Sequence, residues 1–362
     1  MRSVPMLDLG TEYKLFEDEV RSAVHTVLES QHFIGGPSVT ELERRLAEMM
    51  EVPHAVAVSN GSDALLCALM AMEVGPGDEV VVPSFTFFAT AGSVARTGAT
   101  PVFADVDEKT FNVTPETLER VITPKTKVIV PVHLYGQCAD MPAIMAVAER
   151  HGAMVLEDAA QAFGAAIGGK KAGSFGQLST LSFYPTKNLG GFGEGGMIFG
   201  GDAKLVERCL QLRNHGQTQR YIHEFVGGNF RLDTMKASIL LVKTRYVEEF
   251  TRRRMYAERL AGAAVQTPEV PDNRLHVFHQ YTIKVDRRDE LQAFLTDRGV
   301  GSTIYYPRPL HLQPCFSHLG YSEGDLPVSE RLSHNVLSIP CHPMLSDDDI
   351  DYVASCIREF TG

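Results

Sequence analysis

One lysine of this chain stands in a setting that surface lysines rarely have. Lys187 lies in the segment Ser182–Leu189, which places a serine hydroxyl and two aromatic rings before it, and a run of glycines follows as far as Gly196. Glycines let the backbone turn sharply and let a flat ligand approach it closely. An amine held there could act as a nucleophile. Taken alone, the segment is equally compatible with a glycine-rich loop that carries a solvated lysine.

A carboxylate closes a predicted strand upstream of this lysine. Val155–Gln161 reads Val-Leu-Glu-Asp-Ala-Ala-Gln, so that Asp158 follows an apolar run. A carboxylate in such a place is costly unless it has a partner, and a protonated pyridine nitrogen would be one. An amine and a carboxylate are what pyridoxal phosphate requires, because the amine forms the Schiff base and the carboxylate pairs with the ring nitrogen. Gln161 could then reach the phenolic oxygen of the ring, whereas in the alternative interpretation Asp158 only caps the loop after its strand.

A phosphate could bind where a predicted strand passes into a predicted helix. Ser59–Leu65 makes this passage and contains Gly61, Ser62 and Asp63. Backbone amides at a helix start lack an intrahelical partner and attract anions, and the Ser62 hydroxyl adds a donor. The alternative is an ordinary N-cap, in which Ser62 or Asp63 accepts a hydrogen bond from the first turn.

Aromatic rings follow the next predicted strand, in the segment Pro83–Thr90. A ring at this place could stack on a planar cofactor. We expect Phe87 to take that role and Phe85 and Phe88 to lie in the core. The alternative is that all three rings are core residues.

Two polar segments have compositions that could bind a substrate. Gly227–Asp233 precedes a predicted helix and contains Asn229 and Arg231. The alternative is a plain glycine turn in which Asp233 is the N-cap. The second segment, Tyr305–Leu312, mixes aromatic rings, basic side chains and prolines that fix the backbone. Its alternative is a stiff linker.

The elements that must position these residues alternate between strands and helices. We expect strands over 56–58, 79–82, 101–106, 127–132 and 154–156, and helices over 64–72, 85–96 and 141–151. This alternation predicts an α/β fold with a mostly parallel central sheet flanked by helices. Such sheets bind ligands at the carboxyl ends of their strands, where Ser59–Ser62, His133–Gln137 and Asp158–Gln161 lie.

The C-terminal part predicts a smaller α+β unit. One long helix is expected over 233–256, with Met235, Ile239, Val242 and Tyr246 on one buried face. Strands follow over 280–285 and 336–339, and helices over 288–298 and 347–360. We therefore expect a large cofactor-binding domain over 1–245, including the N-terminal segment, and a small domain over 246–362.

Composition argues against several classes of protein. The net charge is −11 and no long basic stretch occurs, which disfavours nucleic-acid binding, so that an anionic substrate needs a locally basic pocket. No apolar run approaches the ~20 residues of a membrane span, and Met1–Pro5 lacks the apolar core of a secretion signal. The six scattered cysteines form no zinc or disulfide pattern. We expect no metal, reduced thiols and a cytoplasmic protein.

Taken together, these segments resemble the DegT/StrS family of pyridoxal-phosphate-dependent nucleotide-sugar aminotransferases, which have the fold of aspartate aminotransferase, fold type I. The resemblance covers nearly the whole chain. It is carried in order by Ser59–Leu65, Gly75–Val80, Glu157–Gln161, Ser182–Gly196, Leu212–Gly216 and His311–Pro314.

The resemblance implies how the cofactor would be held. Lys187 would form the Schiff base and move protons, Asp158 would pair with the ring nitrogen, and Gln161 would contact the ring hydroxyl. Phe87 occupies the ring-stacking position. The phosphate would be bound by Ser62, the amide of Asp63 and Ser182.

The resemblance also implies a shared site. Asn229 matches an asparagine that reaches the phosphate from the partner subunit, so a homodimer would be the working unit. Arg231, Tyr306 and His311 fall where related enzymes contact the sugar nucleotide. Lys236–Ser238 departs from the Gln-Ala-Ala that is common in the family.

The implied reaction moves the amino group of L-glutamate, which leaves as 2-oxoglutarate, to a nucleotide-linked keto sugar. The block 182–190 resembles members that aminate a 3-keto sugar, and 220–233 resembles enzymes acting on UDP-linked 3-keto-2-acetamido hexuronates. A dTDP-linked 3-keto-6-deoxyhexose and a 4-keto sugar are the alternatives. Lys187 disfavours the relatives that carry histidine there and dehydrate the sugar. A cofactor-binding regulator without turnover is an alternative from another class.

Overall fold

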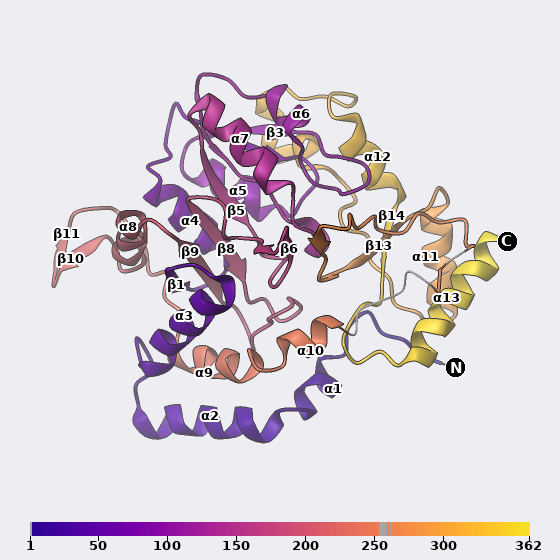
Figure 1. Ribbon diagram of the computed structural model, residues 1–362, viewed down its shortest axis with the longest axis horizontal. Coiled ribbons are helices and arrows are strands. Elements are labelled where there is room, and N and C mark those ends of the chain that lie inside the picture. The colour runs from indigo at the N-terminus through magenta and orange to yellow at the C-terminus, as the bar shows by residue number, and fades with distance from the viewer. Residues whose placement is uncertain (1, 253–258, 261) are drawn as a thin grey trace.

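The protein is built around a mixed sheet, seen in a computed structural model that describes residues 2–252, 259–260 and 262–362 (Figure 1). Seven strands lie in the order β1-β9-β8-β5-β4-β2-β3. They are β1 (His54–Val58), β2 (Glu79–Pro83), β3 (Thr100–Ala104), β4 (Thr126–Ile129), β5 (Met154–Asp158), β8 (Leu178–Ser182) and β9 (Gly196–Gly200). Within this sheet β9 runs antiparallel to both neighbours, and the other pairs are parallel. The mostly parallel sheet that the sequence predicts is confirmed.

Helices cover both faces of this sheet. In β2, Val80 and Val82 pack in one core cluster and Val81 in another, because successive side chains of a strand point to opposite faces. Helices α4 (Gly61–Ala71), α5 (Ala89–Arg96) and α8 (Ala203–Arg213) contribute to the first cluster, and α6 (Pro115–Glu119) and α7 (Met141–His151) to the second. A third cluster lies under α3 (Pro37–Met50) and α9 (Thr234–Lys243).

One helix beside the sheet begins later than the sequence suggests. The helix expected over 85–96 begins at Ala89 as α5. The chain still pairs with the sheet at Ser84, whose amide donates to the Ala104 carbonyl (2.9 Å). The segment Phe85–Phe88 is therefore a connection, in which the Phe85 ring is buried and the Phe87 and Phe88 rings are exposed.

The single long helix expected over 233–256 is wrong. The chain forms α9 and then α10 (Val247–Arg252), while 253–256 lie outside the described residues. At the break the Thr244 hydroxyl donates back to the Leu241 carbonyl (2.7 Å) and the Tyr246 amide bonds to the Lys243 carbonyl (3.0 Å). Such back-bonding and three-residue hydrogen bonds tighten and end a helix.

The face that this helix was expected to bury is partly confirmed. Ile239 and Val242 pack with Phe16 and with helix α2 (Glu17–Ser30), and Tyr246 lies at the edge of the same cluster. Met235 is only half-buried.

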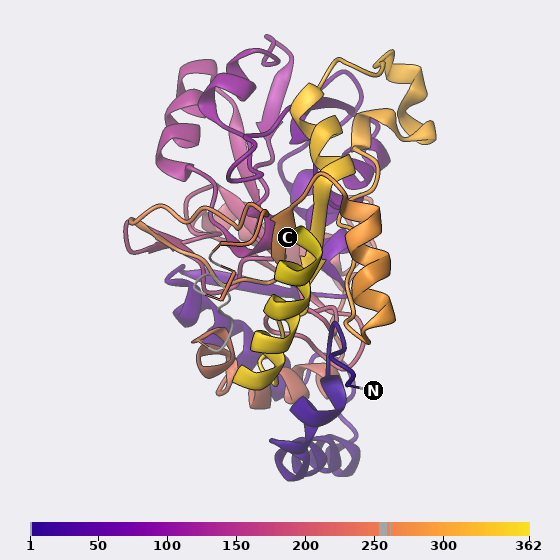
Figure 2. The same ribbon diagram turned by 90° about the vertical axis from the view of Figure 1, so that its right-hand side faces the viewer.

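A second, smaller unit has its own core. Strands β13 (Tyr281–Lys284) and β14 (Val336–Ile339) pair antiparallel, and α11 (Arg288–Asp297) lies beside α13 (Asp347–Thr361) (Figure 2). Val4 is buried in this core and bridges to Val300. The expected division placed the N-terminal segment in the large unit, but its first residues pack in the small one.

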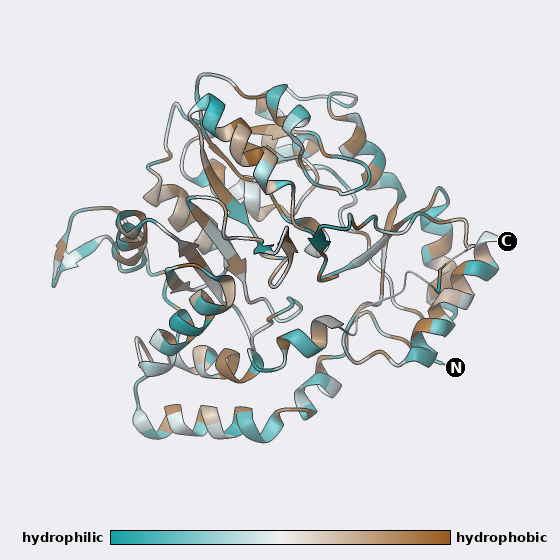
Figure 3. Ribbon diagram, viewed as in Figure 1, coloured by the Kyte–Doolittle hydropathy of each residue, from teal (hydrophilic) through white to brown (hydrophobic). Residues whose placement is uncertain are grey.

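The remaining elements lie at the periphery. A hairpin of β10 (Gln217–Gln219) and β11 (Ile222–His223) projects from the body (Figure 1), and the apolar strands lie inside more polar helices (Figure 3). The other α-helices and strands are α1 (Leu9–Lys14), α12 (Pro327–Asn335), β6 (Ala166–Ile167), β7 (Lys170–Lys171) and β12 (Arg274–Leu275). Among the described helices none has the length and apolar character needed to cross a membrane.

Candidate active site

The lysine singled out by the sequence lies in a tight loop after β8. The Lys187 amide donates to the Tyr184 carbonyl (2.8 Å) and the Gly191 amide to the Phe183 carbonyl (2.8 Å). A Cβ atom on Gly190 would lie 2.1 Å from the Pro185 carbonyl oxygen, so this turn accepts only glycine. Burial lowers the pKa of Lys187 to about 8, with the Asp158 carboxylate opposing the shift, so much of the amine is neutral near that pH.

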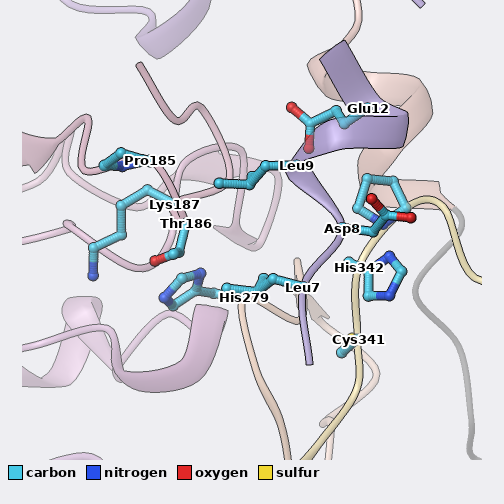
Figure 4. A pocket seen from close by; sticks show the side chains of 11 residues that line it. Leu7, Asp8, Leu9, Glu12, Pro185, Thr186, Lys187, His279, Cys341 and His342 are labelled. Carbon is cyan, nitrogen blue, oxygen red and sulfur yellow. The ribbon is translucent and has the colours of Figure 1, made fainter. Parts of the chain in front are cut away.

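A pocket beside Lys187 joins the two units. Thr186 and Lys187 line it together with the N-terminal segment Leu7–Glu12 and with Cys341 and His342 from the small unit (Figure 4). The lysine side chain points away from Asp8 and Glu12 in this view. The pocket beside Lys187 is therefore formed by more than one part of the chain.

The Asp158 carboxylate is held in place by two donors. The Thr90 hydroxyl donates to Oδ2 (2.8 Å), and the Ala160 amide donates to Oδ1 (3.2 Å). Asp158 is 5% exposed. The neighbouring Glu157 accepts from the amides of Gly173, Phe175 and Gly176 and contacts the ring nitrogen Nε2 of His133 (2.9 Å). Both carboxylates at the end of β5 are thus satisfied.

Gln161 links the end of β5 to Tyr306. Its Oε1 accepts from the Tyr135 amide (2.9 Å), and its Nε2 donates to the Tyr306 hydroxyl (3.0 Å). Tyr135 in turn donates its hydroxyl to the Tyr305 carbonyl. The Tyr306 ring lies 6.3 Å from the Phe87 ring, centroid to centroid. The structure therefore brings together Gln161, Tyr306 and Phe87.

The three phenylalanines after β2 separate differently from the expectation. Phe85 is fully buried, as expected, but Phe88 is 47% exposed and stacks on Phe316 at 5.7 Å. Phe88 is therefore not a core residue, because the late start of α5 turns it toward the surface. Phe87 is 54% exposed, which leaves a ring face open.

The start of α4 packs directly against the end of β8. A Cβ atom on Gly61 would lie 2.7 Å from Cβ of Ser182, so glycine permits this approach. The N-cap is Asn60, whose Oδ1 accepts from the Asp63 amide (2.8 Å). The cap is thus neither Ser62 nor Asp63, and the Asp63 amide expected to bind phosphate already has a partner. The Ser62 hydroxyl and the amides of Gly61 and Ser62 remain the candidates beside Ser182.

His311 contacts Ser84 and Glu330. Its ring is buried, with Nδ1 2.6 Å from the Ser84 hydroxyl and Nε2 3.1 Å from Oε1 of Glu330. Burial lowers its pKa. Both ring nitrogens thus have protein partners, which link Ser84, just after β2, to α12. The substrate contact expected for His311 stays a prediction.

Asn229 and Arg231 lie together on the surface. The Arg231 Nε donates to the Asn229 Oδ1 (2.9 Å), and both residues are exposed. Their segment runs beside the end of β1, where the Ser59 amide donates to the Phe230 carbonyl (3.0 Å). They thus flank the strand that leads into α4, and their side chains are accessible to a second chain.

The sequence and the fold of this chain are similar to those of known aminotransferases. Residues 15–358 match the DegT/DnrJ/EryC1/StrS aminotransferase family. The chain belongs to this family. The solved structure of S. venezuelae DesV, in complex with a ketimine intermediate, is 40% identical with a TM-score of 0.97, over 100% of this chain and 99% of that chain. The predicted fold of this class of pyridoxal-phosphate enzymes is confirmed.

Two relatives of this sugar aminotransferase carry different descriptions. A UDP-N-acetyl-3-dehydro-alpha-D-glucosamine 3-aminotransferase of Acidithiobacillus ferrooxidans is 45% identical over 361 residues, which cover 98% of this chain and 97% of the relative. A pleiotropic regulatory protein of Geobacillus stearothermophilus is 50% identical over 366 residues, covering 99% and 98%. The chain is a pyridoxal-phosphate-dependent sugar aminotransferase.

The residues of the aminotransferase fit this cofactor. Lys187 offers an amine that burial keeps partly neutral, and Asp158 a buried carboxylate opposite it. Phe87 offers an open ring face. The start of α4, beside Ser182, offers an anion site. No group of three or more histidine, cysteine, aspartate or glutamate side chains within 2–252, 259–260 and 262–362 could hold a metal ion.

Sequence interpretation missed Thr90 and Tyr135 in this aminotransferase. Thr90 holds Asp158, and the Tyr135 amide holds Gln161. The spacing of Thr90, one helical turn after Phe87, is a signal that could have been used. The contact of Tyr135 has no local signal, because it joins segments 26 residues apart.

Proposed function

We propose that this sugar aminotransferase transfers the amino group of L-glutamate to C3 of a UDP-linked 3-keto-2-acetamido sugar. The observation that supports a catalytic function is that three cofactor-binding candidates occur together: Lys187, the buried Asp158, and Gln161, which is hydrogen-bonded to Tyr306. The name of the Acidithiobacillus relative supports the UDP-linked 3-keto sugar.

The bound cofactor would supply an electron sink for the carbon that carries the amino group. Lys187 would take a proton from that carbon in the glutamate half and return one in the sugar half. A general acid–base works best when its pKa lies near the working pH, and such proton transfer contributes about 10²–10⁴-fold. Asp158 would hold the ring nitrogen protonated, with Thr90 fixing its other oxygen.

We propose that the active unit is a homodimer with shared sites. Asn229 and Arg231 are exposed beside the start of α4, where they could reach the site of a second chain. Asn229 would contact the cofactor phosphate there. Arg231 would supply the local positive charge that a chain of net charge −11 needs for a sugar nucleotide.

The most detailed part of the proposal concerns which sugar is the substrate. An arginine suits the carboxylate of a hexuronate, and it also suits a diphosphate. A UDP-linked 3-keto-2-acetamido hexuronate is therefore our first candidate and a dTDP-linked 3-keto-6-deoxyhexose the second. A 4-keto sugar is the third.

A regulator without turnover is the candidate from another class. The description of the Geobacillus relative favours it. The retained Lys187, Asp158 and Gln161 oppose it, because a protein that only senses the cofactor does not need a proton-transfer lysine. We also propose a cytoplasmic location, which the six free cysteines support.

One experiment tests the activity and the substrate together. The purified protein is incubated with L-glutamate and a panel of UDP- and dTDP-linked 3-keto and 4-keto sugars, and the amino sugars are identified by mass spectrometry. We expect 2-oxoglutarate and a 3-amino UDP-sugar, with no product from Lys187→Ala. Amination of a 4-keto sugar alone would overturn the regiochemistry. A spectrum that stays unchanged on addition of glutamate would favour the regulator.

A further inference from the structure

The segment that runs from Phe87 through α5 contacts or forms each part of the candidate cofactor site. Phe87, Thr90, Ser93 and Arg96 recur at a spacing of three, so that each lies beside the next along the winding. Phe87 precedes α5 but belongs to the same winding, because the Thr90 amide donates to the Phe87 carbonyl (3.4 Å). Phe87 offers the ring for stacking, Thr90 contacts Asp158, and both Ser93 and Arg96 contact the first turn of α4.

Thr90 acts on the carboxylate. The residue is 1% exposed, and its hydroxyl donates to Oδ2 of Asp158 at 2.8 Å. The Ala160 amide takes the other oxygen. With both oxygens engaged, the plane of the carboxylate is set by the protein and not by the ligand. Without the Thr90 hydroxyl, a buried carboxylate oxygen of Asp158 would lack this hydrogen-bond donor, which is unfavourable in free energy.

Ser93 and Arg96 act on the helix start that faces the phosphate. Ser93 is 2% exposed, and its hydroxyl donates to the Ser62 carbonyl at 3.2 Å. The Arg96 guanidinium lies 3.8 Å from Oδ1 of Asp63. These contacts tie α5 to the first turn of α4, whose amides and Ser62 hydroxyl are the phosphate candidates.

We infer that Thr90 and Ser93 are positioning residues for the cofactor. One rigid helix presents the stacking ring of Phe87, aims Asp158 through Thr90 and holds the first turn of α4 through Ser93. The three contact points of the cofactor are thereby kept at fixed separations before it binds. This inference rests on the cofactor roles proposed for Phe87, Asp158 and Ser62, and it is independent of which sugar is aminated.

The test uses cofactor binding without any sugar. Apoprotein is titrated with pyridoxal phosphate and, separately, with pyridoxal, which lacks the phosphate. Thr90→Val removes the donor and Thr90→Ser keeps it. Thr97→Val is the matched control, because Thr97 is also on this helix segment and donates to the Val94 carbonyl (2.7 Å) away from the site. The pH midpoint of the visible band is measured on the loaded proteins.

We expect Thr90→Val to weaken both ligands by about tenfold, the cost of one lost hydrogen bond to a charged group. The visible-band midpoint should rise, because a misaligned Asp158 stabilises the protonated ring nitrogen less well. Thr90→Ser and Thr97→Val should behave as wild type. The positioning role of Thr90 would be overturned if Thr90→Val and Thr97→Val had the same cofactor affinity and the same visible-band midpoint. It would also be overturned if Thr90→Ser were as impaired as Thr90→Val.

Ser93→Ala separates the two ends of the cofactor and serves if Thr90→Val does not fold. It should weaken pyridoxal phosphate several-fold, leave pyridoxal affinity unchanged and leave the visible-band midpoint in place. The control is Ser333→Ala, since Ser333 is equally buried and donates to the Glu330 carbonyl (2.7 Å) on α12. Equal affinity of Ser93→Ala and Ser333→Ala for pyridoxal phosphate would overturn the role of Ser93.

Discussion

The Nε2 atom of Gln161 lies 3.0 Å from the Tyr306 hydroxyl, although 145 residues separate the two in the chain. Gln161 follows β5 of the central sheet, and Tyr306 lies between the two strands of the small unit in the chain. Burial raises the pKa of the Tyr306 hydroxyl, so it stays protonated and can also donate. Through this pair, the large and the small unit both contribute a residue to one side of the candidate active site.

The Lys187 amine is expected to capture the cofactor. Only the neutral amine attacks an aldehyde, and burial lowers the Lys187 pKa to about 8. The capture rate of apoprotein should therefore rise with pH to a plateau above a midpoint near 8, well below that of an exposed lysine. Borohydride followed by peptide mapping should locate the reduced adduct on Lys187. An adduct on Lys170 or Lys171 would contradict the assignment.

Asp158→Asn keeps the shape of the side chain and removes its charge. Leaving a buried charged partner uncompensated costs about 3–5 kcal/mol, so the half-reaction with glutamate should slow by roughly 10²–10⁴-fold. Stopped-flow absorbance measures this rate. The control is Asp202→Asn, a capping residue at the start of α8. The role fails if the Asp158→Asn rate equals that of the control.

Gln161 and Tyr306 should behave as a coupled pair. Gln161→Ala, Tyr306→Phe and the double variant form a cycle whose interaction term is expected to be about 0.5–1.5 kcal/mol in unfolding free energy. Denaturant unfolding of the apoprotein supplies the four values. Strict additivity of the two substitutions would show that this hydrogen bond contributes nothing in solution.

Inactive variants of the proposed shared site should complement each other. A hybrid of Lys187→Ala and Asn229→Ala subunits keeps one site with both residues intact. Random mixing should restore about a quarter of wild-type activity, since half of the dimers are hybrids with one working site each. Hybrids that stay inactive, while each parent folds and dimerises, would rule out the contribution of Asn229 across the interface.

Arg231→Ala should separate the two half-reactions. Loss of a charge-assisted hydrogen bond costs about 1.5–3 kcal/mol, so the keto-sugar half should weaken about 10- to 100-fold while the glutamate half is retained. A hexuronate substrate should suffer more than a 6-deoxyhexose if Arg231 reads the carboxylate. Stopped-flow measurement of each half is the test, with Arg220→Ala, on the same segment, as control. Equal losses in both halves would move Arg231 to the cofactor site.

Local sequence was sufficient for the parts of this protein that depend on short-range physics. Short apolar runs predicted five of the seven strands of the sheet but not β8 and β9, and α7 begins and ends where its periodicity indicates. The glycines around Lys187 predicted a tight turn, because a Cβ atom at Gly190 would overlap the backbone. Matched blocks gave the family and hence the cofactor.

Tertiary structure decided the matters that depend on distant partners. The sequence predicted that His311 contacts the substrate. In the structure, the Ser84 hydroxyl and the Glu330 carboxylate contact its two ring nitrogens. Val4 belongs to the C-terminal core because it bridges to Val300. The contact of Thr90 with Asp158 spans 68 residues, and periodicity in either segment carries no information about the other. Such pairings arise only when packing of the whole chain places two buried groups side by side.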